Sequence, residues 1–268
     1  MAKVFISIPM LDKPEFNMIY SLYQTIFNCK EHQVRLYFNE NDSLISRARN
    51  NHITAFLEDY NECDYFMSID SDIEIVNTFK TNNLITKLIA QDKDFVGGLY
   101  SAKQVDNPKC SSVTADGVSA IDFDSGLREM KWLSSGCWCV KRSVVEQMAN
   151  AYPELVYDGD DNMAKRKVYG LYIPVIREFK DGDNSFKKYL SEDWAFCDRW
   201  AKLGGKIYAD TSIVLKHYGK QAFSLWQVEA HTRRKNAGDG TTEEQYPESV
   251  PPIGLTTPSL PPAGWELT

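Results

Sequence analysis

The chain has 268 residues, of which 43% are hydrophobic and 25% charged, which is the composition of a globular protein with a substantial core. Its formal net charge of -7 disfavours a nucleic-acid partner, because binding to phosphate backbones depends on lysine and arginine. No apolar stretch approaches the roughly 20 residues that cross a bilayer, so we expect no transmembrane segment. None of the six cysteines forms a Cys-x-x-Cys pair, which disfavours zinc and indicates reduced thiols in a cytoplasmic protein.

The chain up to Tyr100 alternates between strand-like and helix-like patterns. Apolar runs and alternating patterns predict strands, and apolar residues at helical spacing predict helices. The predicted strands are 4–8, ended by Pro9, then 34–38, 65–69 and one that begins at 95–96; the predicted helices lie near 16–27, 45–56 and 84–89. This alternation predicts an α/β fold with a mostly parallel central sheet and helices on both faces.

After Tyr100 the pattern changes to short strand-like pieces, which predict a smaller antiparallel part. These pieces are 112–114, 118–123, 128–133 and 138–140, with a turn at Gly126 and a short helix at 143–149. The polar segment 157–188 contains glycine and proline, and we expect a long loop there that could act as a lid. Ser191 then caps a helix that ends at Gly204, and a final strand follows at 207–209.

The C-terminal segment differs from the rest in composition. Six prolines crowd the residues after about 236, and no hydrophobic periodicity survives there. We therefore expect one domain over residues 1–235 and an extended proline-rich tail over 236–268.

Two carboxylates follow the predicted strand 65–69, in the turn Asp70-Ser71-Asp72. At the period of a strand, the side chains of Asp70 and Asp72 point the same way. Ligands on open α/β sheets bind beyond the carboxyl ends of the strands, and paired carboxylates repel each other unless a cation lies between them. Mg²⁺ or Mn²⁺ completed by substrate phosphates fits this pattern, and a solvated acidic turn is the alternative.

Glu192 and Asp193 begin the predicted helix after Ser191. Acidic residues in a first turn oppose the helix macrodipole favourably, and this structural role alone would explain them. The alternative is catalysis, because a carboxylate near a metal-bound diphosphate could take a proton from an acceptor hydroxyl.

His217 follows the last predicted strand. A lone histidine is usually a packed or surface residue, but here it could return to the sheet edge of the Asp pair as a third ligand for Mn²⁺. On the helix 45–56, Arg47 and Asn51 share a face, from which an arginine could hold a diphosphate in bidentate fashion. A solvated helix face is the alternative for this pair.

Glycines and a lysine near two strand ends are further candidate contacts for a phosphate or sugar. Gly98 and Lys103 follow the strand that begins at 95–96, where glycine permits close approach of a ligand and lysine could meet a phosphate. Gly136, in Ser135-Gly136-Cys137, could do the same for a transferred sugar. Turn chemistry alone would also explain each of them.

Taken in order from about residue 3 to 220, these segments resemble the GT-A glycosyltransferases, in particular the soluble type of bacteria, large viruses and phages. The matching pieces are 46–50 (SRARN), 68–73 (SIDSDI), 96–100 (VGGLY), 135–137 (SGC), 190–197 (LSEDWAFC), 203–207 (LGGKI) and His217. The segment 157–188 matches nothing in that pattern.

The resemblance implies a GT-A fold and a role for each matching residue. Asp70 and Asp72 would form the D-x-D motif, in which the second Asp usually binds the metal and the first more often faces the ribose. His217 would be the distal metal ligand, and Asp193 would be the base of a Glu-Asp motif. The strand end at Ile8 and Pro9 would line the nucleotide base.

The function that follows is a metal-dependent glycosyltransferase. With Mn²⁺ or Mg²⁺, it would move a sugar from a UDP- or GDP-linked donor to a hydroxyl of a glycan or another acceptor. We expect inversion with a carboxylate base, in the cytoplasm of a bacterium or of a virus-infected host cell. The alternatives are a metal-dependent nucleotidyltransferase, although residues 9–14 lack the glycine-rich loop of such enzymes, and a non-catalytic sugar- or nucleotide-binding module.

Overall fold

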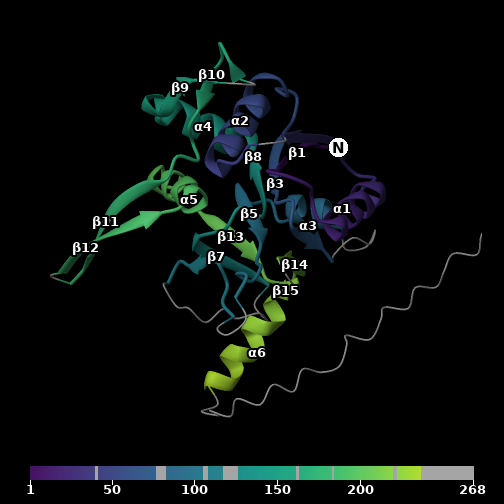
Figure 1. Cartoon of the computed structure of the whole chain (residues 1–268), viewed down its shortest axis with the longest axis vertical. Helices are drawn as coiled ribbons and strands as arrows, with labels where there is room; N and C mark the ends of the chain where they lie inside the picture. Colours follow the sequence, from purple (N-terminus) through teal and green to yellow (C-terminus); the bar gives the residue numbers. More distant parts are fainter. Residues whose placement is uncertain are drawn as a thin grey trace, which may run out of the picture.

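The computed structural model describes residues 1–39, 42–76, 83–104, 108–116, 126–160, 163–182, 184–219 and 222–236 (Figure 1). Within these residues the centre of the molecule is an eight-stranded sheet with the strand order β2-β1-β3-β8-β5-β13-β7-β6. The strands are β1 (Lys3–Pro9), β2 (Gln33–Asn39), β3 (Tyr65–Ile69), β5 (Phe95–Gly98), β6 (Val113–Thr114), β7 (Leu127–Trp132), β8 (Cys137–Lys141) and β13 (Ile207–Asp210). Strands β7 and β8 run opposite to the others, so the predicted mostly parallel α/β sheet is confirmed.

Helices cover both faces of this sheet, because side chains along each buried strand alternate between two cores. On β1, Phe5 joins one core, while Ile6 and its alternate neighbours join the other. The first core is covered by α2 (Ile45–Glu58), α4 (Arg142–Ala151) and α5 (Glu192–Lys202). The second is covered by α1 (Phe16–Asn28) and α3 (Leu84–Ala90). The predicted helices on both faces are therefore confirmed.

The segment predicted as a long lid loop, 157–188, is instead mostly strand. It contains β10 (Lys167–Tyr169), which pairs with β9 (Val156–Asp158) after the short 3-10 helix Pro153–Leu155. It also contains β11 (Val175–Asp181) and β12 (Asn184–Leu190), an antiparallel ribbon that projects from the body beside α5 (Figure 1). Gly182 turns this ribbon at a φ of 57°. The prediction was wrong because the exposed ribbon carries mostly polar side chains, which resemble a loop in composition.

The strand predicted as the last one, 207–209, is followed by further elements. Strand β14 (Leu215–Tyr218) lies between β15 (Ala222–Ser224) and β4 (Ile73–Ile75) in a small antiparallel sheet, and α6 (Leu225–Asn236) comes after it. The predicted strand 118–123 and the tail beyond Asn236 lie outside the described residues. In the part of the chain that is described, no helix has both the length and the apolar character needed to cross a membrane.

Candidate functional site

The turn Asp70-Ser71-Asp72 lies between β3 and β4, at the carboxyl end of the central parallel strands. The Asp70 amide donates to the Gly136 carbonyl at 3.0 Å, and the Glu15 amide donates to the Ser71 carbonyl at 2.8 Å. The turn is thus tied to the start of β8 on one side and to the start of α1 on the other. This is the sheet edge at which open α/β folds bind ligands.

His217 reaches this turn because β14 pairs with β4. The register places His217 opposite Ile73, and the Tyr218 amide donates to the Asp72 carbonyl at 2.8 Å. The His217 Nε2 atom then lies 3.6 Å from Asp72 Oδ2. The sequence pattern suggested that His217 returns to the sheet edge of the Asp pair. The structure places His217 beside Asp72.

The hydrogen bond on the other side of the His217 ring fixes its tautomer. Nδ1 lies 2.9 Å from the Ser101 carbonyl, which can only accept, so Nδ1 carries the proton. In the neutral ring, the lone pair is therefore on Nε2, facing Asp72. Tyr100 packs edge-on against the ring, with 5.1 Å between the centroids, and holds its plane. A backbone carbonyl behind a histidine is the usual way to orient a metal-binding imidazole.

Lys103 contacts the same oxygen of Asp72 that His217 faces, with its Nζ atom 2.5 Å from Oδ2. Burial raises the pKa of the Asp72 carboxyl, but the contacts with His217 and with the Lys103 ammonium outweigh it and leave the pKa below its ordinary value. Asp72 is therefore an anion whose charge is balanced by the partly exposed Lys103.

Asp70 belongs to a different, buried cluster. Arg49 on α2 is 3% exposed and donates from Nη2 to Asp70 Oδ1 at 2.8 Å and from Nη1 to Ser68 Oγ at 3.2 Å. Its Nε atom lies 3.7 Å from a carboxylate oxygen of Glu192 at the start of α5. The guanidinium thus joins β3, α2 and α5 beneath the site.

The surroundings of Asp70 and Glu192 act on their pKa values in the same direction. Burial raises the pKa of the Asp70 carboxyl, and the attraction of Arg49 opposes this only in part. Burial and the neighbouring charge of Asp193 likewise raise the pKa of Glu192. Both carboxyls depend on one arginine, so Arg49 is a residue of the site that the sequence analysis did not select.

Asp193 is held at the first turn of α5 through one of its two oxygens. Its Oδ1 atom accepts from the Ser191 hydroxyl and from the Trp194 amide, the latter at 2.7 Å. In the described part of the chain, Oδ2 has no hydrogen-bond partner. Burial raises the pKa of the Tyr100 phenol, and the charges of Asp70 and Asp193 add to this effect.

The glycines at this edge are required by packing within the protein. The Gly136 amide donates to the Tyr100 hydroxyl at 2.9 Å, and a Cβ on Gly136 would lie 2.7 Å from that oxygen. A Cβ on Gly98 would lie 2.8 Å from the Leu215 side chain, within the contact between β5 and β14. Gly98 therefore makes room for the strand that carries His217.

The other sequence candidates have described contacts that do not involve Asp72 or His217. Arg47 pairs with Asp42 at 2.9 Å and with Asp160 at 3.4 Å. Asn51 is half-buried, and it is its neighbour Asn50 that accepts from the Tyr172 amide at 2.8 Å. Ile8 and Pro9 are buried at the end of β1, paired with 38–39 of β2.

The donor types at the mouth of the site fit a divalent cation only in part. Among the described residues no cluster of three histidine, cysteine or acidic side chains is arranged to hold a metal. Asp72 and His217 offer a carboxylate oxygen and an imidazole nitrogen, which suit Mn²⁺ when phosphates complete the shell. Arg49 holds Asp70 through its Oδ1 atom, so Asp70 could offer a cation its other oxygen, Oδ2.

Comparisons with known proteins give similar structures but no family. No protein-family profile matches the chain, and no curated protein matches it. A197 from STIV is 16% identical, with 82% of this chain and 86% of that chain covered and a TM-score of 0.49. A glycosyltransferase involved in the glycosylation of the major capsid of PBCV-1 is 12% identical, with 57% and 67% covered and a TM-score of 0.34.

A synthase for 4-diphosphocytidyl-2C-methyl-D-erythritol from Anaerococcus prevotii is 9% identical, with 60% of this chain and 81% of that chain covered and a TM-score of 0.31. All of these TM-scores lie below 0.5, so a function for this chain has to be derived from its own site.

Proposed function

We propose that the chain is a metal-dependent glycosyltransferase of the GT-A type, which moves a sugar from a UDP- or GDP-linked donor to a hydroxyl of a glycan or another acceptor. The observation that carries this proposal is the pairing of His217 Nε2 with Asp72 Oδ2 at 3.6 Å, with the ring oriented by the Ser101 carbonyl. Two lone-pair donors that face each other at the carboxyl edge of a sheet are what a cation between them would require.

Asp72 and His217 would hold the cation, Mn²⁺ or Mg²⁺, with phosphate oxygens of the donor. When bound, the cation supplies Lewis-acid stabilisation of the leaving diphosphate. Lys103 now neutralises Asp72 and would turn to a donor phosphate once that charge is balanced. Asp70, held by Arg49, would orient the ribose or the sugar, and Ile8, Pro9, Ser71 and Gly136 would line the donor.

Asp193 is the proposed base. Its Oδ1 atom is fixed by the Ser191 hydroxyl and the Trp194 amide, so the position of Oδ2 is fixed as well. An acceptor hydroxyl bound against Oδ2 would lose its proton to the carboxylate as it attacks the anomeric carbon. Attack on the face opposite the leaving diphosphate inverts the configuration, which is the outcome that we propose.

The first test is a thermal-shift panel of nucleoside diphosphates with and without Mn²⁺. We expect one nucleotide to raise the melting temperature of the wild type only when the metal is present. Asp72→Asn should abolish this rise. Asp158→Asn is the matched control, because Asp158 also pairs with a lysine, at 2.6 Å, but on β9. Metal-dependent stabilisation that survives in Asp72→Asn, or none by any nucleotide in the wild type, would contradict the proposal.

The second test separates the base from the donor site. Asp193→Asn should keep the metal-dependent stabilisation by the nucleotide and slow release of the nucleoside diphosphate from the matching nucleotide sugar by about 100-fold or more. Turnover that is unchanged in Asp193→Asn would remove Asp193 as the base while leaving the donor site intact.

A further inference from the structure

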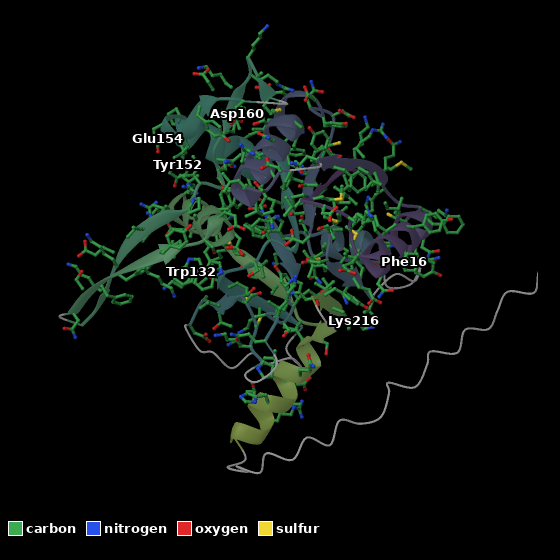
Figure 2. The ribbon with its side chains drawn as sticks, in the orientation of Figure 1. Phe16, Trp132, Tyr152, Glu154, Asp160 and Lys216 are labelled. Carbon is green, nitrogen blue, oxygen red and sulfur yellow. The ribbon has the colours of Figure 1, made fainter. Side chains whose placement is uncertain are left out.

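The outward face of α1 carries a stripe of exposed aromatic side chains. Phe16 is 77% exposed, Tyr20 54%, Tyr23 57% and Phe27 57%. Their rings stack in pairs along the helix, Phe16 on Tyr20 and Tyr23 on Phe27. Phe16 lies at the edge of the molecule that α1 forms (Figure 2). Large contiguous apolar surfaces are rare on monomers, so this aromatic stripe requires an explanation.

The stripe is not a displaced part of the core. At 100° per residue, its four members fall within an arc of about 60°, and the buried side chains of α1 lie on the opposite side of the helix. These buried residues are Met18, Ser21, Leu22 and Thr25. The helix Phe16–Asn28 contains no charged residue, so charge does not indicate which of its faces is exposed to solvent.

The spacing of the stripe is its most informative property. The intervals between Phe16, Tyr20, Tyr23 and Phe27 are four, three and four residues, which is the alternation of a helix–helix seam. The pattern also reads the same in both directions, with phenylalanine outside and tyrosine inside. In an antiparallel pair about a two-fold axis, Phe16 would meet Phe27 of the other helix and Tyr20 would meet Tyr23. Such self-complementarity is the requirement of an isologous interface.

From these observations we infer that the aromatic stripe of α1 is an interface for a second copy of this chain, with the two helices packed antiparallel. The stripe exposes of the order of 500 Å² per copy, since each aromatic side chain presents about 150–250 Å² and somewhat more than half is free. Ile19, 37% exposed on the same helix, adds to it. The sum is close to the roughly 600 Å² per partner at the lower end of specific interfaces.

The charges around α1 favour a second copy over a lipid surface. Lys13 and Lys30 flank the stripe, but Asp12, Glu15 and Glu31 outnumber them. Helices that lie on anionic membranes carry an excess of lysine and arginine beside their apolar face. A mixed set of charges at both ends suits an antiparallel pair, in which each end meets the opposite end of its partner.

This interface would also join the two candidate sites. The helix begins against the Asp70-Ser71-Asp72 turn, through the Glu15 amide, and the Asn17 amide group donates to the Tyr218 hydroxyl at 2.8 Å. Pairing of two α1 helices would therefore set the two sites in a fixed relation. The inference does not depend on the proposed activity, because it rests on the stripe alone.

Sedimentation velocity of the full chain tests the inference. Between about 1 and 100 µM, we expect a monomer–dimer equilibrium. The double variant Tyr20→Lys/Tyr23→Lys places like charges across the seam and should weaken dimerisation by about 100-fold or more. Tyr189→Lys is the matched control, because Tyr189 is 64% exposed on the ribbon, and it should leave the dimer unchanged. Circular dichroism verifies that each variant is folded.

A cross-link tests the geometry separately. When Tyr20→Cys and Tyr23→Cys proteins are mixed and oxidised, the antiparallel pair predicts a disulfide between the two variants in preference to one within either variant. Wild-type protein gives the background, since the described cysteines other than Cys110 are buried. A monomer at every concentration, a dimer that the double lysine variant leaves intact, or cross-links only between identical variants would each overturn the inference. A monomer that binds phosphatidylcholine–phosphatidylserine vesicles through α1 would assign the stripe to lipid instead.

Discussion

Helix α2 carries two buried side chains one turn apart that the fold keeps in opposite charge states. Arg49 is 3% exposed and charged, because Asp70 and Glu192 lie at its guanidinium. His52 is fully buried and neutral, because burial lowers the pKa of its ring and its described hydrogen-bond partners are uncharged. Its Nε2 atom lies 2.7 Å from Asn39 Oδ1 and its Nδ1 atom 2.6 Å from Ser7 Oγ.

The different partners of Arg49 and His52 determine what each cluster of residues can do. The carboxamide oxygen of Asn39 only accepts, so His52 donates from Nε2 and accepts the Ser7 hydroxyl proton at Nδ1. Every polar atom of the ring is thereby satisfied without charge, and the cluster fastens α2 to β1 and β2. Arg49 instead brings two carboxylates to the sheet edge at which a substrate would bind. One cluster is suited to hold the fold, and the other to hold the site.

The largest effect should come from breaking the charged cluster. Arg49→Leu leaves Asp70 and Glu192 without their cation, and we expect the free energy of unfolding to fall by about 3–5 kcal/mol. Urea denaturation at neutral pH measures this. Arg49→Lys keeps the charge but cannot contact both carboxylates at once. Its free energy of unfolding should therefore lie between those of the wild type and Arg49→Leu. A loss below about 1 kcal/mol in Arg49→Leu would show that the buried carboxyls are already neutral.

The sequence predicted the position of the charged cluster better than its members. The apolar run 65–69 predicted β3, and the carboxyl edge of that strand is where Asp70 and Asp72 lie. Arg47 was selected on α2, but Arg49 is the buried one. The available signal was spacing: Arg49 is four residues before Ile53, which is buried on the face of α2 that turns to the core. A charged residue on such a face needs a buried partner.

Other parts could not be predicted because they depend on contacts distant in sequence. The pairing of β14 with β4 brings His217 to Asp72, and the intervening 140 or so residues give no local sign of it. The aromatic residues of α1 correctly predicted a helix, but helical spacing does not state which face meets the core. Here Met18 and Leu22 are buried, and the larger aromatic side chains of the stripe are exposed.

The stability contributed by the neutral cluster around His52 should depend on pH. Burial, with a smaller contribution from the Arg49 charge, lowers the pKa of His52 from 6.5 to about 3. The unfolded chain takes up a proton as the pH falls below 6.5, whereas the folded protein does not, so stability contributed by neutral His52 is lost on acidification. Between pH 7 and pH 5 we expect a decrease of about 2 kcal/mol in the free energy of unfolding from this group.

His52→Gln isolates that contribution, because glutamine can donate to Asn39 but does not titrate. Denaturation curves at pH 7 and pH 5 should show a smaller decrease in the variant than in the wild type, by about the amount above. If both proteins lose the same stability on acidification, His52 is already able to take up a proton in the folded state, and the neutral assignment is wrong.

The smallest effect should come from Arg47, the other arginine of α2. The Arg47 side chain is 30% exposed and pairs with Asp42, whose side chain is 9% exposed, and with Asp160, whose side chain is 62% exposed. Because Arg47 itself still reaches solvent, Arg47→Gln should lower the free energy of unfolding by about 1 kcal/mol or less. Asp42 would still accept from the Leu44 amide at 3.0 Å. Urea denaturation of Arg47→Gln beside Arg49→Leu measures the contrast directly. Equal losses in the two variants would mean that burial does not separate these arginines, and the distinction drawn along α2 would fail.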